Sequence, residues 1–232
     1  MNALWPVTLM IACEAGIILY AASKAVPFYL RILGVVVNML VIALYGPFLV
    51  SISGWTTNVG CIWFVAATVS LCIIMEQYGR HAARVVIPLV YAAQTGVIMI
   101  GFLLHSFPAV PDNPAMTAIL VVSDHSLRVV AGSFSAFFLS VGMVLIPAWT
   151  ALRPRLGVVK ASALACIACQ IVDTPAFFIP AFWGVVPDAK LLEIMAVGLA
   201  FKVMLAVVFM PVVWLATTDR LSAWRQQQPR LA

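Results

Sequence analysis

Charged residues are scarce in this sequence of 232 residues: Asp, Glu, Lys and Arg together make up 9% of it, whereas 64% is hydrophobic. A soluble domain is about half apolar and about a quarter charged, so this chain has too few polar side chains to cover a water-soluble particle. The mean hydropathy is +1.10. The apolar residues form long unbroken runs rather than the short alternating segments of a transmembrane barrel. We therefore predict an all-α integral membrane protein.

Several functional motifs are missing as well. The sequence has no G-x-x-x-x-G-K-[ST] motif, so we expect no ATPase within the chain, and it has no N-x-[ST] sequon. Cys166 and Cys169 form a C-x-x-C without a second cysteine pair or a nearby histidine, which predicts buried thiols rather than a metal or redox centre. The N-terminus lacks a basic n-region, and Glu14 interrupts its apolar run, so we expect a retained first helix. We expect no enzymatic activity, no cofactor and no metal site.

Seven apolar runs approach the length of about 20 residues that a membrane-spanning helix needs. They cover residues 4–23, 32–53, 58–76, 85–106, 128–150, 160–182 and 192–217. The connections between them are short, which predicts a single transmembrane domain over residues 1–232. We divide this domain into an additional N-terminal helix (1–27), a six-helix core (32–217) and a cytoplasmic tail (218–232).

Basic residues gather in alternate connections, which indicates the side that faces the cytoplasm. They follow the first, third, fifth and seventh runs: Lys24, Arg31, Arg80, Arg84, Arg153, Arg155, Lys160, Arg220, Arg225 and Arg230. We therefore predict an N-terminus outside and a cytoplasmic C-terminus, with residues 108–126 outside, in the inner membrane of a bacterium. This pattern accounts for the net charge of +5 and implies the lipid bilayer, not a nucleic acid, as partner.

Ionisable side chains at bilayer depth are candidates for function, because such a charge costs about 3 kcal/mol or more. Six fall within or at the ends of the runs: Glu14, Glu76, Arg128, Asp173, Glu193 and Lys202. We expect Arg128 to anchor its span at the interface or to point into a cavity. Glu76 is expected to pair with Arg80 or to act as a gate. For Glu14 and Glu193 we expect structural or interfacial roles.

Asp173 is the strongest binding candidate, because it lies in the otherwise apolar stretch CQIVDTPAFFIPAFWG. Gln170, Asp173, Thr174 and Phe177 follow an i, i+3, i+4, i+7 spacing, which places them on one face of a helix. Pro175 favours a kink beside them, because it removes a backbone donor. A carboxylate, an amide, a hydroxyl and an aromatic ring on one face predict a site for a planar heterocycle that carries several N–H groups.

Lys202 lies near the middle of the last run, in GLAFKVML. We expect it to be the counter-ion of Asp173 or a direct ligand contact. If Asp173 pairs with Lys202 or with Arg128, the polar face is a clamp between helices, a role that is compatible with ligand binding. A lysine in a seventh helix is also typical of retinal proteins. Gly198 stands where such a protein would carry an acidic residue four positions earlier, which disfavours a retinal-type receptor.

The stretch CQIVDTPAFFIPAFWG resembles the signature of the queuosine precursor transporter family, also called the vitamin uptake transporter family. That signature reads S-Q-[LI]-[IV]-D-T-x-x-F followed by A-F-W, and the matching positions are Gln170, Asp173, Thr174, Phe177, Ala181, Phe182 and Trp183. Three further segments are similar to the family pattern: EQYGRHAARVVI (76–87), RVVAGSFSA (128–136) and FKVMLAVVFMPVVW (201–214). The resemblance covers residues 32–217 in the right order.

This resemblance implies a fold similar to the six-helix substrate-binding subunits of vitamin importers, working without their ATPase module. It implies 7-deazaguanine precursors of queuosine as substrates, with a 7-cyano or a 7-aminomethyl group. The implied pocket residues are Asp173 and Gln170 as binding groups, Thr174 and Phe177 as supporting contacts, and Arg128, Glu76 and Lys202 as groups that line or gate the route.

Two pairs of positions depart from the family pattern. Leu71 and Cys72 stand where the family usually has Thr-Asp, and Val141 and Val144 stand where it has a Gln and an Asp. We therefore interpret the chain as a divergent member, for which another nucleobase-like or vitamin-like ligand is one alternative. A substrate-binding membrane subunit that needs a separate energy-coupling partner is another. The energy source and the oligomeric state, including a homo-oligomer, stay open.

Overall fold

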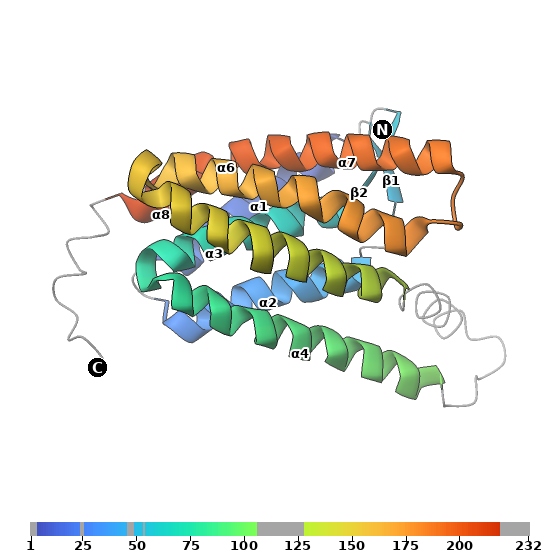
Figure 1. Ribbon diagram of the computed structural model, residues 1–232, viewed down its shortest axis with the longest axis horizontal. Helices are drawn as coiled ribbons and strands as arrows, with labels where there is room; N and C mark the ends of the chain where they lie inside the picture. The colour runs from blue at the N-terminus through green and yellow to red at the C-terminus, as the bar shows by residue number, and fades with distance from the viewer. Residues whose placement is uncertain (1–3, 24–25, 46–48, 53, 106–127, 219–232) are drawn as a thin grey trace.

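The structure of the protein, a computed structural model, describes residues 4–23, 26–45, 49–52, 54–105 and 128–218. Its apolar segments form helices that run side by side in a bundle (Figure 1). The named elements are α1 (Leu4–Ala22), α2 (Phe28–Tyr45), β1 (Leu49–Ile52), β2 (Trp55–Asn58), α3 (Gly60–Tyr78), α4 (Arg80–His105), the π-helix η1 (Phe138–Leu145), α6 (Ile146–Phe182), α7 (Asp188–Val208) and α8 (Met210–Thr217). Residues 128–137 are helical and lead into η1.

Four helical segments of the described chain are long and apolar enough to cross a membrane: Trp5–Ala22, Gly60–Tyr78, Arg128–Phe182 and Asp188–Thr217. Phe28–Ala43 is a shorter apolar helix. The helix α4 has 26 residues, or about 39 Å at 1.5 Å per residue. Helices suit a bilayer because they satisfy the backbone hydrogen bonds within their own length. The prediction of an all-α membrane protein is confirmed, and the protein is a multi-pass membrane protein.

The long segment Arg128–Phe182 folds back on itself at Gly157. This residue lies within α6 at φ +75° and ψ 170°, and glycine adopts a positive φ more readily than any other residue. The two helical arms on either side of Gly157 lie side by side (Figure 1). The Trp149 indole on one arm donates a 3.1 Å hydrogen bond to Ser162 Oγ on the other. The structure therefore agrees with separate spans over 128–150 and 160–182.

The predicted span 32–53 is wrong at both ends. The helix α2 begins at Phe28 and ends at Tyr45, and residues 49–52 form β1, which pairs antiparallel with β2. In the sequence, Gly46-Pro47 separates the two, and a proline disfavours a helical conformation of the residue before it. Hydropathy alone does not report this break, because the apolar run continues through it.

The predicted span 192–217 consists of two helices, α7 and α8, which meet at Phe209. Pro211 explains the break, because its ring clashes with the carbonyl four residues earlier and it has no N–H to donate. Pro175 and Pro180 act differently. Both lie inside α6, where Gly157 is the residue with non-helical backbone angles, so the backbone keeps helical angles where a kink was predicted.

Polar contacts distinguish the two ends of the bundle. At one end, Arg153 Nε and Nη2 donate to the two carboxylate oxygens of Glu76 at 2.6 and 2.8 Å. At the same end, Arg31 donates to Oε1 of Gln77, the residue that follows Glu76. Arg31 also donates to the carbonyl oxygen of Ser23 at 2.7 Å. We call this the basic end, and we call the opposite end, with β1, β2 and the start of α7, the hairpin end. The predicted outer segment 108–126 and the tail beyond residue 218 lie outside the described residues.

Candidate ligand-binding site

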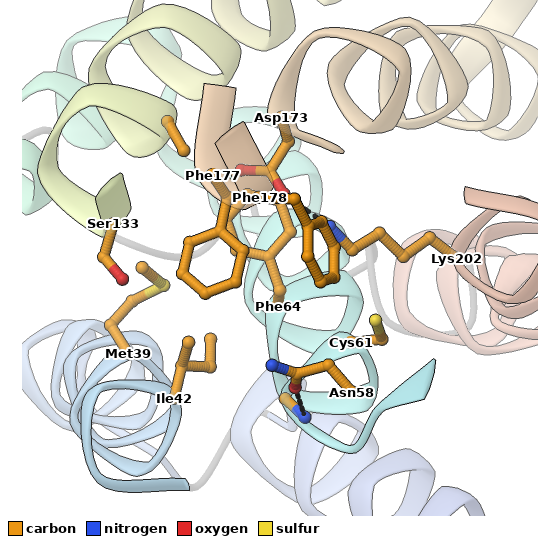
Figure 2. A pocket seen from close by; sticks show the side chains of 12 residues that line it. Met39, Ile42, Asn58, Cys61, Phe64, Ser133, Asp173, Phe177, Phe178 and Lys202 are labelled. Carbon is orange, nitrogen blue, oxygen red and sulfur yellow. Dashed lines mark hydrogen bonds and ion pairs between the residues drawn. The ribbon is translucent and has the colours of Figure 1, made fainter. Parts of the chain in front are cut away.

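A pocket of about 380 Å³ lies between the helices (Figure 2). Because Asn58 and Gly60 belong to its wall, it lies in the half of the bundle that is nearer the hairpin end. Its walls come from α2, the end of β2, the start of α3, residues 128–137, α6 and α7. They are formed by Met39, Ile42, Asn58, Gly60, Cys61, Phe64, Ser133, Ala136, Asp173, Phe177, Phe178 and Lys202. An apolar and aromatic lining with a few polar groups is typical of a small-molecule site.

Asp173 and Lys202 form a buried ion pair in the wall of this pocket. Lys202 Nζ lies 2.6 Å from Asp173 Oδ2, and each side chain is 4% exposed. The ammonium nitrogen also lies 5.3 Å from the ring centroid of Phe64 and 5.6 Å from that of Phe178, within the range of cation–π contacts. The structure thus confirms Lys202 as the counter-ion of Asp173. The pair carries no net charge, which makes its burial tolerable.

The other carboxylate oxygen of Asp173 faces η1. Ser140 Oγ lies 3.3 Å from Asp173 Oδ1 and 2.5 Å from the carbonyl oxygen of Ala136. A hydroxyl has a single proton to donate, so Ser140 does not satisfy Asp173 by itself. A carboxylate offers about four lone-pair positions, which leaves Asp173 able to accept hydrogen bonds from a ligand while it stays paired with Lys202.

Aromatic rings form the apolar side of the pocket. The rings of Phe177 and Phe178 meet edge to face, with centroids 5.1 Å apart and planes at 78°. Phe178 in turn stacks on Phe182 at 5.7 Å and 29°. Such rings present large flat surfaces against which another planar ring can pack. Phe177 belongs to the predicted site, whereas Phe178 and Phe64 do not.

Ser133 and Asn58 are polar pocket residues that the sequence did not single out. Asn58 Oδ1 accepts a hydrogen bond from the backbone N–H of Gly60 at the start of α3. Ser133 is 4% exposed, and its Oγ has no hydrogen-bond partner within the described part of the chain. Figure 2 shows Ser133 on the opposite side of the Phe177 and Phe178 rings from Lys202. A buried hydroxyl without a partner costs about 1–3 kcal/mol, so a ligand group that bonds to it would offset that cost.

The position of Ser133 depends on a close approach of two helices. A Cβ added to Gly132 would lie 2.9 Å from the carbonyl oxygen of Phe177, closer than real Cβ atoms come to an oxygen. Glycine at this position therefore lets the segment 128–137 rest against α6. Small residues allow such approaches between membrane helices, and the run AGSFSA is the signal in the sequence that could have pointed to Ser133.

Gln170 and Thr174 share the buried face of α6 with Asp173, as their spacing predicted. They do not line the pocket, however. Thr174 Oγ1 donates to the carbonyl oxygen of Gln170 at 2.8 Å. Gln170 Nε2 donates to Thr68 Oγ1 on α3 at 3.4 Å, while Gln170 Oε1 is buried with no partner among the described residues. Their role as ligand contacts stays a prediction.

Arg128 and Glu76 lie at opposite ends of the bundle, away from the pocket lining. Arg128 is exposed and donates from Nη2 to the carbonyl oxygen of Trp183 at 2.8 Å, where α6 ends. Glu76 accepts two hydrogen bonds from Arg153 at the basic end, a partner that the expectation of an Arg80 pair missed. The structure brings together Asp173, Lys202 and Phe177 from the predicted set.

Membrane-spanning helices around a pocket with an ion pair and aromatic walls are the features of a multi-pass protein with a candidate small-molecule site. A family model described as "Putative vitamin uptake transporter" matches residues 58–216, which is more than half of the chain. The chain therefore belongs to the vitamin uptake transporter family and is a transporter of that type. No curated protein and no solved structure matches the chain.

Proposed function

We propose that the protein imports a small planar heterocycle across the bacterial inner membrane, and that the heterocycle is a 7-deazaguanine precursor of queuosine. The observation that carries the proposal is the buried Asp173–Lys202 pair in the wall of an aromatic pocket. The sequence resemblance around Asp173 supports the same substrate class. The organisation as one transmembrane domain with an additional N-terminal helix is part of this proposal.

The ion pair suits the edge of a lactam ring. A 7-deazaguanine presents a carbonyl oxygen beside a ring N–H and an amino group. Lys202 can donate to the carbonyl, and Asp173 can accept from the N–H and the amino group, in charge-assisted hydrogen bonds that are stronger than neutral ones. The ring of Phe177 can pack against the heterocycle, and Ser133 can bond to its far edge. Gln170 and Thr174 support the Asp173 face of α6.

The arrangement of charges supports the proposed orientation. Arg31 and Arg153 both lie at the basic end, and an excess of such residues faces the cytoplasm in membrane proteins. The pocket is then in the outer half of the bundle. The Glu76–Arg153 pair, which joins α3 to α6, is placed to act as the cytoplasmic gate, and Arg128 holds the outer end of α6.

The test is binding of 7-cyano-7-deazaguanine to the purified protein, followed by uptake into vesicles. Asp173→Asn keeps the size of the side chain but replaces an acceptor by a donor that faces the ligand N–H. The loss of a charged hydrogen bond should cost about 1.5–3 kcal/mol, or roughly ten- to a hundredfold in affinity. Glu193→Gln, a carboxyl-to-amide change in a half-buried pair with Lys190 away from the pocket, is the matched control.

Two outcomes would contradict the proposal. A folded Asp173→Asn protein that binds and transports like the parent would show that Asp173 is a structural clamp alone. Tighter binding of 7-deazaadenine, which has an amino group and a ring nitrogen acceptor in place of the lactam edge, would show that the pocket reads a different heterocycle.

A further inference from the structure

Glu14, like Asp173, is an acidic residue within a membrane-spanning segment. It does not line the pocket that contains Asp173, and it precedes the residues 58–216 that match the family model. It lies near the middle of α1, within the membrane-spanning segment Trp5–Ala22. Most of α1 faces outward, but Glu14, Ile18 and Ala22 are buried. These three residues are four positions apart, so they form the narrow face with which α1 packs on the bundle.

The carboxyl group of Glu14 is surrounded by neutral hydrogen-bonding groups. Asn38 Nδ2 on α2 lies 3.4 Å from Glu14 Oε2, and the Trp63 indole on α3 is its other hydrogen-bonding neighbour. Asp173 is paired with Lys202, and Glu76 is paired with Arg153. Glu14, by contrast, has no cation within ion-pair distance in the described part of the chain. An unpaired carboxylate at bilayer depth is unfavourable, so this site favours the neutral acid, which carries a proton.

A second cavity, of about 370 Å³, begins beside the Glu14 contact. It lies between α1, α2 and α3 and is lined by Ile17, Ile18, Ala21, Ala22, Arg31, Gly34, Asn38, Ser70, Ile73 and Ile74. Asn38, Ser70 and Arg31 give it polar groups that can hydrogen-bond to water. Asn38 and Arg31 are seven residues apart on α2, or about 10 Å along the helix. The cavity therefore leads from the amide that contacts Glu14 toward the basic end.

Three helices pack against α1, and their polar groups define the electrostatic surroundings of Glu14. From α2 these groups are Asn38 and Arg31, the latter held by the carbonyl oxygens of Ser23 and Val26. From α3 they are the Trp63 indole, Ser70 and, at the basic end, Gln77 and Glu76, which is bound to Arg153. The third helix, α8, has the sequence MPVVWLAT and contributes no titratable group. Arg31 is thus the charged group that faces the cavity.

We propose that Glu14 is the proton-binding site that couples uptake to the proton gradient. In each cycle the carboxylate takes up one proton from the outer side and releases it to water in the cavity lined by Asn38, Ser70 and Arg31. The heterocycle itself is unchanged, so the proton is the second transported species. This inference rests on the proposed function for the coupling, but the proton site itself does not depend on the identity of the ligand.

The competing role for Glu14 is that of a hydrogen-bonded anchor for α1. Glutamine can make the same contacts to Asn38 and Trp63 but cannot bind a proton, so Glu14→Gln separates the two roles. Glu14→Asp keeps a titrating group and serves as the conservative variant. Glu193→Gln makes the same chemical change at a half-buried position outside the pocket and is the matched control.

The first test needs no substrate. The full-length parent, Glu14→Gln and Glu193→Gln proteins are reconstituted in lipid vesicles, and the infrared carbonyl band of protonated carboxylic acids is followed as the pH changes. We expect a pH-dependent band in the parent and in Glu193→Gln that is missing in Glu14→Gln. An unchanged band in Glu14→Gln would overturn the proton site.

The second test compares two modes of transport with labelled 7-cyano-7-deazaguanine, whose neutral substituent keeps the probe free of its own pH response. We expect Glu14→Gln to lose about tenfold or more of the accumulation driven by an imposed pH gradient, a size typical of coupling between two bound species. Exchange of labelled for unlabelled probe across the membrane should stay near the parent rate, and Glu14→Asp should keep the accumulation.

Accumulation at the parent level in Glu14→Gln would overturn the coupling. Equal loss of exchange and accumulation in a folded Glu14→Gln protein would also overturn it, since Glu14 would then support the fold of the transport path. If the parent itself neither exchanges nor accumulates the probe, the proposed function fails, and the infrared band decides the proton site on its own.

Discussion

Asp173 and Glu14 are both carboxyl groups at membrane depth, and the protein accommodates them in opposite ways. Asp173 faces a lysine at 2.6 Å, two aromatic rings and a pocket. Glu14 faces an amide at 3.4 Å and lies on a helix that is mostly exposed. The first arrangement stabilises a charge, whereas in the second the burial of the carboxyl group without a cation disfavours the charge. The same residue chemistry therefore suits ligand recognition in one place and proton binding in the other.

The difference teaches that the partner of an intramembrane carboxyl, more than its depth, indicates its role. A cation balances the charge of the carboxylate and leaves lone pairs for a ligand. Neutral donors hold the group in place without fixing its charge. Four substitutions test this contrast, from the largest expected effect to the smallest.

Lys202→Met should have the largest effect, because it leaves the Asp173 carboxylate buried without a cation. We expect a loss of about 3–5 kcal/mol in the free energy of unfolding, measured by denaturation of the purified protein in detergent micelles. The double variant with Asp173→Asn should recover part of the loss. Strictly additive losses would mean that the two side chains do not stabilise each other.

Gly132→Ala should come next, because the new methyl group would meet the backbone oxygen of Phe177 at 2.9 Å. We expect a loss of about 1–3 kcal/mol, as for other overpacked contacts, from the same unfolding measurement. Gly16→Ala on α1, where nothing lies within 4 Å, is the control and should not destabilise. Equal effects at both glycines would contradict the tight contact between the segment 128–137 and α6.

Asn38→Ala should cost less than either, about 0.6–1 kcal/mol, the size of a typical side-chain hydrogen bond between membrane helices. The loss stays small because a neutral Glu14 has no buried charge to expose and keeps Trp63 beside it. A loss as large as that of Lys202→Met would indicate that Glu14 carries a charge, contrary to the proposed proton site.

Ser133→Ala should have the smallest effect on stability, and it could even stabilise, because it removes a buried hydroxyl that lacks a partner. Affinity for 7-cyano-7-deazaguanine should nevertheless fall, by about 0.5–1.5 kcal/mol, up to roughly tenfold. Ser135→Ala, two residues away and exposed, is the matched control for binding. A loss of stability without a loss of affinity would remove Ser133 from the ligand site.

Sequence periodicity was enough to predict the buried face of α6. Gln170, Asp173, Thr174 and Phe177 are all buried, because a 3.6-residue repeat fixes which positions share a side of a helix. The pairing of Asp173 with Lys202 was also within reach, since few opposite charges lie deep in the spans. The hairpin was missed, because β1 (LVSI) continues the apolar run of α2 and because β2 (WTTN) lies where the sequence indicates a polar connection between two spans.

Contacts between helices that are distant in sequence could not be predicted in the same way. Glu76 of α3 pairs with Arg153 of α6, which is 77 positions further along the chain, and this pairing depends on how the two helices are rotated against each other. Ser133 gave no signal by itself, because serine is common in membrane helices and only the rotation of its helix decides whether it faces a pocket or lipid.

The π-helix η1 adds a constraint of a different kind, on chain length. A π-helical turn holds one more residue than an α-helical turn, and each residue added to a helix rotates its N-terminal part by about 100° relative to its C-terminal part. Ser133 precedes η1, and Ser140 lies within it. Deleting one residue from this segment would restore a plain α-helix and turn Ser133 away from the side that Ser140 shares with Asp173. Single-residue insertions and deletions within residues 138–145 are therefore a route by which relatives of this protein could change their pocket without changing any residue that lines it.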